Sequence, residues 1–356
     1  MKQRLLLFIT ALMLCIGARA TTIQVIDGLK YIIYTDHNCA VLTGNNYTQK
    51  EIVIPASITW EGKKYPVTEL RVKCFSNCSS LTSITIPSSV TSLGDRCFDG
   101  CNSLTAVTIP SSVTSLGEGC FSGCSSLTSI NIPSSVTSLG GACFLKCSSL
   151  TAVTIPSSVT SLGNSCFEGC RNLASITIPS SVTSLGDACF QSCSSLTSIN
   201  IPSSVTSLGH SCFYGCSSLT SITIPLSVTR LGNYCFSSCN LASITIPSSV
   251  TRLNEHCFSD CTSLTSITIP SSVTWLGDDC FYGCTSLTSV TIPSSVEILG
   301  HGCFYYCTSL TSVTIPSSVT MLGRSCFAKC NNLAHPTNPV ECCADANPKT
   351  MLPNDT

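Results

Sequence analysis

Cysteine is the residue type in this chain whose number and spacing could support chemistry. The 356-residue sequence contains 28 cysteines, and 24 of them form twelve CxxxC pairs, the first being Cys74 and Cys78. Thiols at this spacing could form disulfides, bind a soft metal ion, or stay reduced inside a hydrophobic core. The leading cysteines of the pairs are Cys74, Cys97, Cys120, Cys143, Cys166, Cys189, Cys212, Cys235, Cys257, Cys280, Cys303 and Cys326.

The spacing within each pair favours buried free thiols. Residues four apart on a regular helix have Cβ atoms about 5–6 Å apart, whereas a disulfide prefers roughly 3.8 Å. Cysteine is also among the most buried residue types and packs as a small hydrophobe. A metal site is disfavoured, because CxxxC is not the tighter CxxC of zinc knuckles and only five histidines are scattered over the chain. Disulfides in some of the repeats stay open as the alternative.

The cysteine pairs recur with a fixed period. Each leading cysteine follows the previous one by 23 residues, except that Cys257 follows Cys235 by 22 because one residue is missing between Cys239 and Leu241. A period in this range indicates a solenoid, in which each coil buries its apolar face only against its neighbours. The architecture that positions the cysteines is therefore about twelve stacked repeats.

The residue choices within one repeat predict its local structure. Residues 81–87 read LTSITIP, in which alternate apolar residues point inward from a short strand and the proline ends it. Val90 and Leu93 return to the core, and Gly94 permits a tight corner. All phenylalanines after residue 20, from Phe75 to Phe327, fall in one column, which predicts a core ladder.

A short helical turn is expected after the corner glycine. The residue that follows this glycine is polar in most copies, a type that suits the positive start of a helix. Glycine at Gly100 and its equivalents then stops the turn. The predicted fold is an α/β solenoid of short parallel strands and short helical turns. The polar residues are Asp95, Glu118, Asn164, Asp187, Asn233, Glu255 and Asp278.

The two ends of the chain differ from the repeats. Residues 1–20 are expected to be a secretory signal peptide, because Lys2 and Arg4 precede a dozen apolar residues and Ala18-Arg19-Ala20 offers a cleavage site. Residues 21–73 are interpreted as an N-terminal cap with one degenerate repeat, and residues 74–334 as the solenoid. Residues 335–356 are expected to be a C-terminal tail or remnant cap.

The repeats carry a resemblance to a known family. The pattern LxxIxIPxxVxxLGxxCFxxC, repeated over residues 50–334, resembles the BspA-like class of bacterial and protozoan leucine-rich repeats. It departs from that class at Cys74 and its equivalents, where alanine is more usual. The resemblance implies a right-handed leucine-rich-repeat solenoid on a secreted or surface-exposed protein that adheres to host matrix proteins or other cells. No motif of the family fixes binding residues, so none is transferred to this chain.

Composition and motifs argue against several other functions. Only 10% of residues are charged and the formal net charge is −1, so no basic field exists to attract nucleic acid or anionic lipid. The histidines share no column with an acid and a nucleophile, and no Walker loop, GxGxxG or zincin motif is present. We expect a non-enzymatic protein without cofactor or metal.

One column of the repeat changes character along the chain. The residue before the corner leucine is serine from Ser92 to Ser207 and large thereafter. Because its neighbours point inward, this column should be exposed, and exposed Trp and Arg are common in protein-binding hot spots. Relaxed drift in the later copies, or packing beneath the tail, is the alternative explanation. The predicted partner-binding residues are Arg230, Arg252, Trp275, Ile298 and Met321, with Tyr282 and Tyr305 on the side of the expected helical turn.

The sequence therefore predicts a secreted or cell-surface protein that mediates protein binding and adhesion to host matrix or other cells. The partner would be an extracellular matrix or cell-surface protein. A spacer or antigenic decoy that binds nothing is the first alternative. A remote alternative is ice binding through the regular serine and threonine columns of the strand face, beginning at Ser83 and Thr85.

Overall fold

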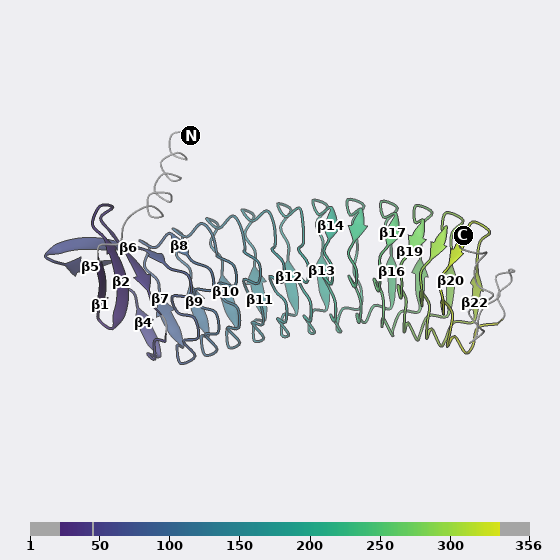
Figure 1. Cartoon of the computed structure of the whole chain (residues 1–356), viewed down its shortest axis with the longest axis horizontal. Coiled ribbons are helices and arrows are strands. Elements are labelled where there is room, and N and C mark those ends of the chain that lie inside the picture. The colour runs from purple at the N-terminus through teal and green to yellow at the C-terminus, as the bar shows by residue number, and fades with distance from the viewer. Residues whose placement is uncertain (1–21, 45, 335–356) are drawn as a thin grey trace, which may run out of the picture.

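The computed structural model describes residues 22–44 and 46–334. They form an elongated solenoid whose coils stack side by side from the N-terminal cap to residue 334 (Figure 1). The expected signal peptide and the expected tail lie outside the described residues. The prediction of about twelve stacked repeats is confirmed. The prediction of helical turns is wrong, because the described residues contain strands and turns but no helix.

A mixed sheet begins the structure. Its strands β1 (Thr22–Ile26), β2 (Leu29–Tyr34) and β3 (Cys39–Thr43) lead through β6 (Lys63–Leu70) to β5 (Ser57–Trp60). Neighbours in this order are antiparallel, except that β3 pairs with β6 in parallel. One face of this sheet, including Tyr31 and Leu42, belongs to the continuous core of the coils. The ring of Tyr47 packs 5.2 Å from that of Phe75, so the N-terminal end of the core is covered.

The strand face of the solenoid is built from three-residue parallel strands. Their central residues are buried and the flanking ones exposed, as the alternation in LTSITIP predicts. Equivalent residues pair in register, for example Ser129 with Ala152. The first sheet contains β4 (Glu51–Val53), β7 (Ser83–Thr85), β9 (Ala106–Thr108), β10 (Ser129–Asn131), β11 (Ala152–Thr154), β12 (Ser175–Thr177) and β13 (Ser198–Asn200); the second contains β16 (Ser243–Thr245), β18 (Ser266–Thr268), β20 (Ser289–Thr291) and β22 (Ser312–Thr314).

The strand face is interrupted once. Residues 221–223 form only an isolated bridge between Asn200 and Thr223 instead of a strand. This coil directly precedes the missing residue between Cys239 and Leu241. The single deletion therefore coincides with the division of the strand face into two sheets.

A second set of strands, each two residues long, follows the corner. In the first half of the chain this side is held mainly by isolated bridges between leucines, such as Leu116 with Leu139. In the second half these bridges lengthen into paired strands. The strands are β8 (Ser92–Leu93), β14 (Ser207–Leu208), β15 (Arg230–Leu231), β17 (Arg252–Leu253), β19 (Trp275–Leu276), β21 (Ile298–Leu299) and β23 (Met321–Leu322).

The third side of each coil replaces the expected helical turn. The residue before each leading cysteine has a positive φ, for example 54° at Arg96, and a second positive φ of 72° follows at Gly100. A right-handed helix cannot continue through such residues. The backbone N–H groups instead donate to the next coil, as from Phe98 to the carbonyl of Cys120 at 2.8 Å. The coil-to-coil ladder thus takes the place of helical hydrogen bonds.

The backbone hydrogen bonds between coils have opposite directions on two sides. Just before most of the strands, an N–H group donates to the preceding coil, as from Thr128 to Thr105. On the turn side they donate to the following coil, as from Gly123 to Leu145. The two faces of an interior coil are therefore complementary, since donors on one face meet acceptors on the facing side of the next coil.

A ladder of phenylalanine rings runs through the core. Neighbouring rings lie 5.1–5.7 Å apart and almost parallel from Phe75 to Phe327. All but the last are fully buried. The predicted core ladder is confirmed.

The corner glycines are required by the close approach of successive coils. A Cβ atom on Gly140 would lie 2.7 Å from the backbone nitrogen of Glu118 and 2.8 Å from the carbonyl carbon of Gly117. Gly140 has no positive φ, so backbone freedom is not the reason for glycine here. The tight corner predicted from the sequence is present. Glycine is needed there because the backbone of the neighbouring coil leaves no room for a Cβ atom.

Replacing Gly140 with alanine should therefore lower the free energy of unfolding by about 3 kcal/mol, because only backbone atoms can move to relieve the contact. Gly141→Ala is the matched control. Its Cβ would have nothing nearer than 3.3 Å, so we expect a loss below about 1 kcal/mol. Urea unfolding followed by circular dichroism measures both variants, and equal losses would contradict the close-approach explanation.

Candidate functional site

The stripe that we define as Arg230, Arg252, Trp275, Ile298 and Met321 lies along one side of the solenoid. Each member is the first residue of a two-residue strand whose second residue is leucine. The leucine that follows each of the first four stripe residues is fully buried. Because alternate residues of a strand point to opposite sides, the stripe side chains point outward. Arg230, Arg252 and Met321 are exposed, and Trp275 and Ile298 are half-buried.

The structure brings two members of the stripe into direct contact. The guanidinium carbon of Arg252 lies 5.8 Å from the centre of the Trp275 ring, a cation–π arrangement. At the start of the stripe, Nη2 of Arg230 lies 3.5 Å from Nε2 of His210 in the preceding coil. The stripe therefore begins with cationic groups and continues into apolar ones.

The predicted tyrosines form a separate contact. Tyr282 and Tyr305 stack with their ring centres 5.5 Å apart and their planes 1° from parallel. They lie on the turn side of the coils, and no hydrogen bond or ring contact between described residues joins them to the stripe. The structure thus divides the predicted site residues into two surfaces.

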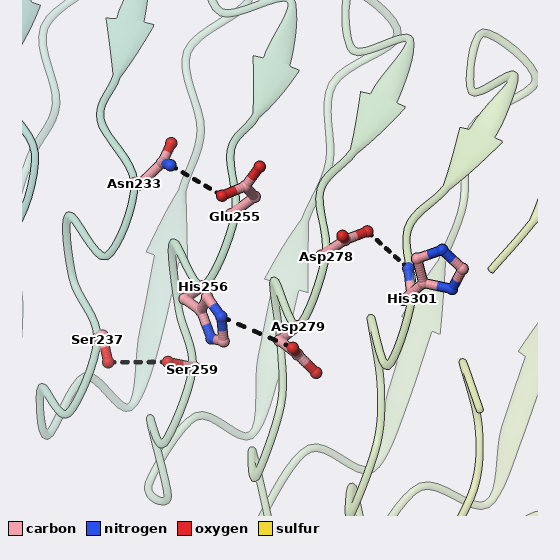
Figure 2. Close-up of polar contacts among 8 residues, drawn as sticks. All are labelled: Asn233, Ser237, Glu255, His256, Ser259, Asp278, Asp279 and His301. Atoms are coloured by element: carbon pink, nitrogen blue, oxygen red, sulfur yellow. Dashed lines mark hydrogen bonds and ion pairs between the residues drawn. The ribbon is translucent and has the colours of Figure 1, made fainter. Parts of the chain in front are cut away.

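A polar cluster that the sequence did not predict lies on the turn side (Figure 2). The ring of His256 stacks on Tyr234 at 4.4 Å, and its Nε2 lies 3.6 Å from Oδ2 of Asp279. Beside them Nδ2 of Asn233 donates to Oε2 of Glu255 at 3.0 Å. Tyr234, His256 and Asp279 all stand immediately before a leading cysteine, at separations of 22 and 23 residues. Aligning the residues that precede the leading cysteines, with a step of 22 at the shortened coil, places these three side chains in neighbouring coils.

The polar cluster lacks the geometry of a catalytic triad. The buried hydroxyls of Ser237 and Ser259 bond to each other at 2.8 Å (Figure 2). Among residues 22–44 and 46–334, no hydroxyl or thiol forms a hydrogen bond with the His256 ring. The acid and the histidine therefore have no activated nucleophile beside them.

The polar residues expected to start helical turns have another role. Oδ1 of Asp95 accepts the backbone N–H of Glu118, and Oδ1 of Asp187 accepts that of His210, at 2.9 and 2.7 Å. Oδ1 of Asp278 accepts the N–H of His301 in the same way at 2.7 Å (Figure 2). Each acceptor satisfies a donor one coil further along. The sequence predicts that these polar side chains cap a helix. They instead accept a hydrogen bond from a backbone N–H of the next coil.

The two cysteine columns are part of the core. The second cysteine of a pair donates its thiol hydrogen to the phenylalanine carbonyl of the preceding coil, as from Cys147 to Phe121 at 3.1 Å. The same bond recurs in successive coils, for example from Cys193 to Phe167. In the structure the repeat cysteines are free thiols, and all but Cys330 are buried. This geometry agrees with the buried-thiol interpretation, and the redox state in solution stays a prediction.

Burial makes the thiols poor nucleophiles. Removal from water disfavours the thiolate and raises the pKa of Cys101, Cys147, Cys193 and Cys261 to about 12. In the described part of the chain, no three His, Cys, Asp or Glu side chains converge as metal ligands would. The same residues include no helix long and apolar enough to cross a bilayer.

Several solved structures are similar to the chain. A leucine-rich repeat protein from Bacteroides ovatus is 29% identical with a TM-score of 0.70, and the match covers 87% of this chain and 93% of that one. A leucine-rich cell surface protein from Faecalibacterium prausnitzii is 27% identical with a TM-score of 0.61, covering 89% and 94%. The pneumococcal vaccine antigen PcpA, at 18% identity and a TM-score of 0.56, covers 86% and 90% and supports the fold alone.

The sequence itself also matches a family model. The BspA type leucine-rich repeat region matches residues 68–196, 142–263, 185–301 and 229–342. No curated protein matches the chain. Since the family matches overlap to span most of the sequence, and the solenoid has the corresponding fold, the chain belongs to the BspA-type leucine-rich repeat family.

Proposed function

We propose that this chain is an exported, non-enzymatic scaffold that binds a protein at the cell surface or in the extracellular matrix and thereby mediates adhesion. Three observations support the proposal. The family is one of protein-binding repeats, the similar Faecalibacterium prausnitzii protein is described as a cell surface protein, and residues 1–20 have the features of a signal peptide.

The observation that carries the binding proposal is the change in a single column. Serine occupies this column in every regular coil from Ser92 to Ser207, and large side chains occupy it from Arg230 onward. The core columns stay nearly constant over the same coils, so the change is confined to the surface. A surface that becomes larger and more aromatic while the core is unchanged is typical of a binding face.

The stripe also indicates the chemistry of the partner. Its five members follow one another at the spacing of parallel strands, about 4.8 Å, so the stripe is roughly 19 Å long. An extended partner segment would place acidic groups beside Arg230 and Arg252 and apolar groups over Trp275, Ile298 and Met321. Tyr282 and Tyr305 would contact a different part of the partner, because they lie on the turn side.

Binding by the stripe can be tested with the double variant Arg252→Ala, Trp275→Ala. We expect the variant to keep its fold and to bind the partner at least about 30-fold more weakly, since truncating a hot-spot residue costs 2 kcal/mol or more. A panel of purified extracellular-matrix proteins is screened first by surface plasmon resonance with the unaltered protein. The dissociation constant of each saturable partner is then compared between the two proteins.

The matched control is Ser115→Ala, Ser138→Ala, two positions of the same column in the first half of the chain. It should leave both stability and binding unchanged. If the stripe variant is folded and binds as tightly as the unaltered protein, the stripe is not the binding face. If no member of the panel binds saturably, the spacer or decoy alternative is favoured.

Ice binding gains no support from the strand face. The exposed threonine column is replaced by Asn131 and Asn200, and the adjacent serine column by Ala106 and Ala152. The sheet itself is interrupted at residues 221–223. A regular hydroxyl array is therefore broken in several places.

A further inference from the structure

The last described coil is the one place where the cysteine columns reach the surface. Val319, Leu322, Cys330 and Leu333 are half-buried there, whereas their equivalents in the preceding coils are buried. Among the repeat cysteines Cys330 alone is not buried. A reagent in solution can therefore approach the Cys330 sulfur without unfolding of a coil.

Cys330 has a second thiol directly behind it. Cys307 occupies the same position one coil earlier, and the backbones of neighbouring coils in a parallel stack are about 4.8 Å apart. That spacing falls within the Cα separation of disulfides, about 4.4–6.8 Å, although their Cβ atoms must approach to roughly 3.8 Å. A small movement of one coil is therefore needed to join the two sulfurs.

The last described coil forms fewer backbone hydrogen bonds with described residues than the interior coils do. In earlier coils the turn-side N–H groups donate to the following coil, as from Tyr306 to Ala328. The equivalent N–H groups of Ser325, Phe327 and Lys329 have no acceptor among the described residues. Among the described residues, the last coil is therefore hydrogen-bonded on this side to one neighbouring coil, whereas an interior coil such as that of Cys261 is hydrogen-bonded to two.

The two thiols also differ in acidity. Each thiol donates its hydrogen to the phenylalanine carbonyl of the preceding coil, Cys307 to Phe281 at 3.2 Å and Cys330 to Phe304 at 3.1 Å. The interaction between the two neighbouring sulfurs lowers the pKa of Cys330, and this interaction together with burial raises the pKa of Cys307. Partial exposure together with stabilisation of the thiolate is typical of reactive cysteines. Cys330 would accordingly be the attacking thiol and Cys307 the resolving one.

We propose that Cys330 and Cys307 form a thiol pair that reacts with disulfides at the C-terminal end of the solenoid. The Cys330 thiolate attacks one sulfur of a disulfide RSSR, and the released thiolate RS⁻ takes up the proton that Cys330 has lost. The Cys307 sulfur, after losing its own proton, then attacks the Cys330 sulfur and expels a second RS⁻, which takes up that proton. The two cysteines lose two electrons to RSSR, and the products are one Cys307–Cys330 disulfide and two RSH.

This reaction is independent of the stripe and of the proposed adhesion. It requires a disulfide in the surroundings, either a small molecule or an exposed disulfide on another protein. The extracellular space and other oxidising compartments contain such disulfides. A covalent link to a partner disulfide would form first, and Cys307 would then release it.

The test uses an aromatic disulfide whose released thiolate is coloured, added to the native full-length chain. Cys15, Cys342 and Cys343 lie outside the described residues and are changed to serine to simplify the count. We expect two equivalents of aryl thiolate to appear about a hundredfold faster than from the buried thiols, which react only after local opening. Peptide mapping should then find a Cys307–Cys330 disulfide and no retained aryl group.

Three variants separate the steps. Cys307→Ser should release one equivalent and retain the aryl group on Cys330, and Cys330→Ser should remove the fast release. Cys284→Ser, in the same column one coil earlier, is the matched control and should behave as the parent. Circular dichroism checks that each variant is folded, and Cys330→Ala replaces Cys330→Ser if that one is not. The proposal is wrong if Cys330 reacts no faster than the buried thiols, or if the parent releases one equivalent and keeps the adduct.

Discussion

Raising the pH above about 9 should unfold the solenoid steeply, because the unfolded thiols ionise while the folded ones stay neutral. Burial raises the pKa of Cys101, Cys147, Cys193 and Cys261 from the ordinary thiol value of 9.0 to about 12. The folded state then binds more protons than the unfolded state between these two values. Stability is therefore complete below pH 9 and is lost as the pH rises toward 12.

The expected loss is large because many thiols contribute. Each one removes about 1.4 kcal/mol per pH unit within this window. The four thiols above would together remove on the order of 10 kcal/mol, comparable to the whole stability of an ordinary domain. The free energy of urea unfolding, measured at intervals from pH 7 to 11, should stay level up to about pH 9 and fall thereafter.

Two controls assign this pH dependence to the thiols. Cys147→Ala, Cys193→Ala removes two titrating groups and should reduce the slope above pH 9 by about 2.7 kcal/mol per pH unit. The buried Tyr31 and the half-buried Tyr47 also have raised pKa values, but their effect starts near 10, the ordinary tyrosine value. Constant stability between pH 9 and 11 would contradict the assignment.

The prediction also requires the repeat cysteines to be reduced in solution. Alkylation under denaturing, non-reducing conditions, read by mass spectrometry, counts them directly. Nearly all 24 should be modified. If few are, the alternative of disulfides within or between coils is correct, and the alkaline transition will be absent.

Phe190→Ala should lower the free energy of unfolding by roughly 3–5 kcal/mol through the cavity that it leaves. The Phe190 ring is fully buried and stacks between Phe167 and Phe213, at 5.6 Å from each. Its loss removes contacts with two neighbouring coils at once. Since a solenoid is stabilised by such nearest-neighbour contacts, both interfaces should weaken.

Tyr214→Ala supplies the comparison for this substitution. Tyr214 is an aromatic residue of the adjoining coil, with 37% of its surface exposed. Its removal should cost less than about 1 kcal/mol. Urea unfolding monitored by circular dichroism measures both variants, and a loss below 1 kcal/mol for Phe190→Ala would show that the ring ladder is not a main source of stability.

Much of the solenoid could be predicted from the sequence because the repeat aligns equivalent residues. Stacking like on like is sufficient to place Phe75 above Phe98 and Cys78 above Cys101, and the core columns follow. The conformation of the segment around the leading cysteines, expected to be helical, could not be predicted in this way. Residues such as Arg96 and Tyr234 adopt a positive φ although their side chains have no preference for it. Hydrogen bonds to the next coil accompany that conformation, and within the column glycine, at Gly119 and Gly302, is the residue type that favours it.

The candidate site shows a similar division. The outward direction of Arg252 and Trp275 follows from the inward direction of their neighbours, and the structure places both at the surface. Their contact, and the stacking of His256 on Tyr234, depend on which coils are adjacent and how far apart they lie. Tyr234 and His256 are 22 residues apart, so a comparison in steps of 23 residues does not place them in the same column.

The opposite directions of the backbone hydrogen bonds on the strand and turn sides have a consequence for how such a protein changes over generations. Because the two faces of every interior coil are complementary and repeat from coil to coil, a whole coil can be inserted or lost without leaving a mismatched interface. Duplication or deletion of one repeat in the gene would alter only the length of the protein. The loss of a single residue, as between Cys239 and Leu241, is in contrast accompanied by an interruption of the sheet. Selection can therefore vary the reach of this protein in whole coils more easily than it can vary the size of a coil.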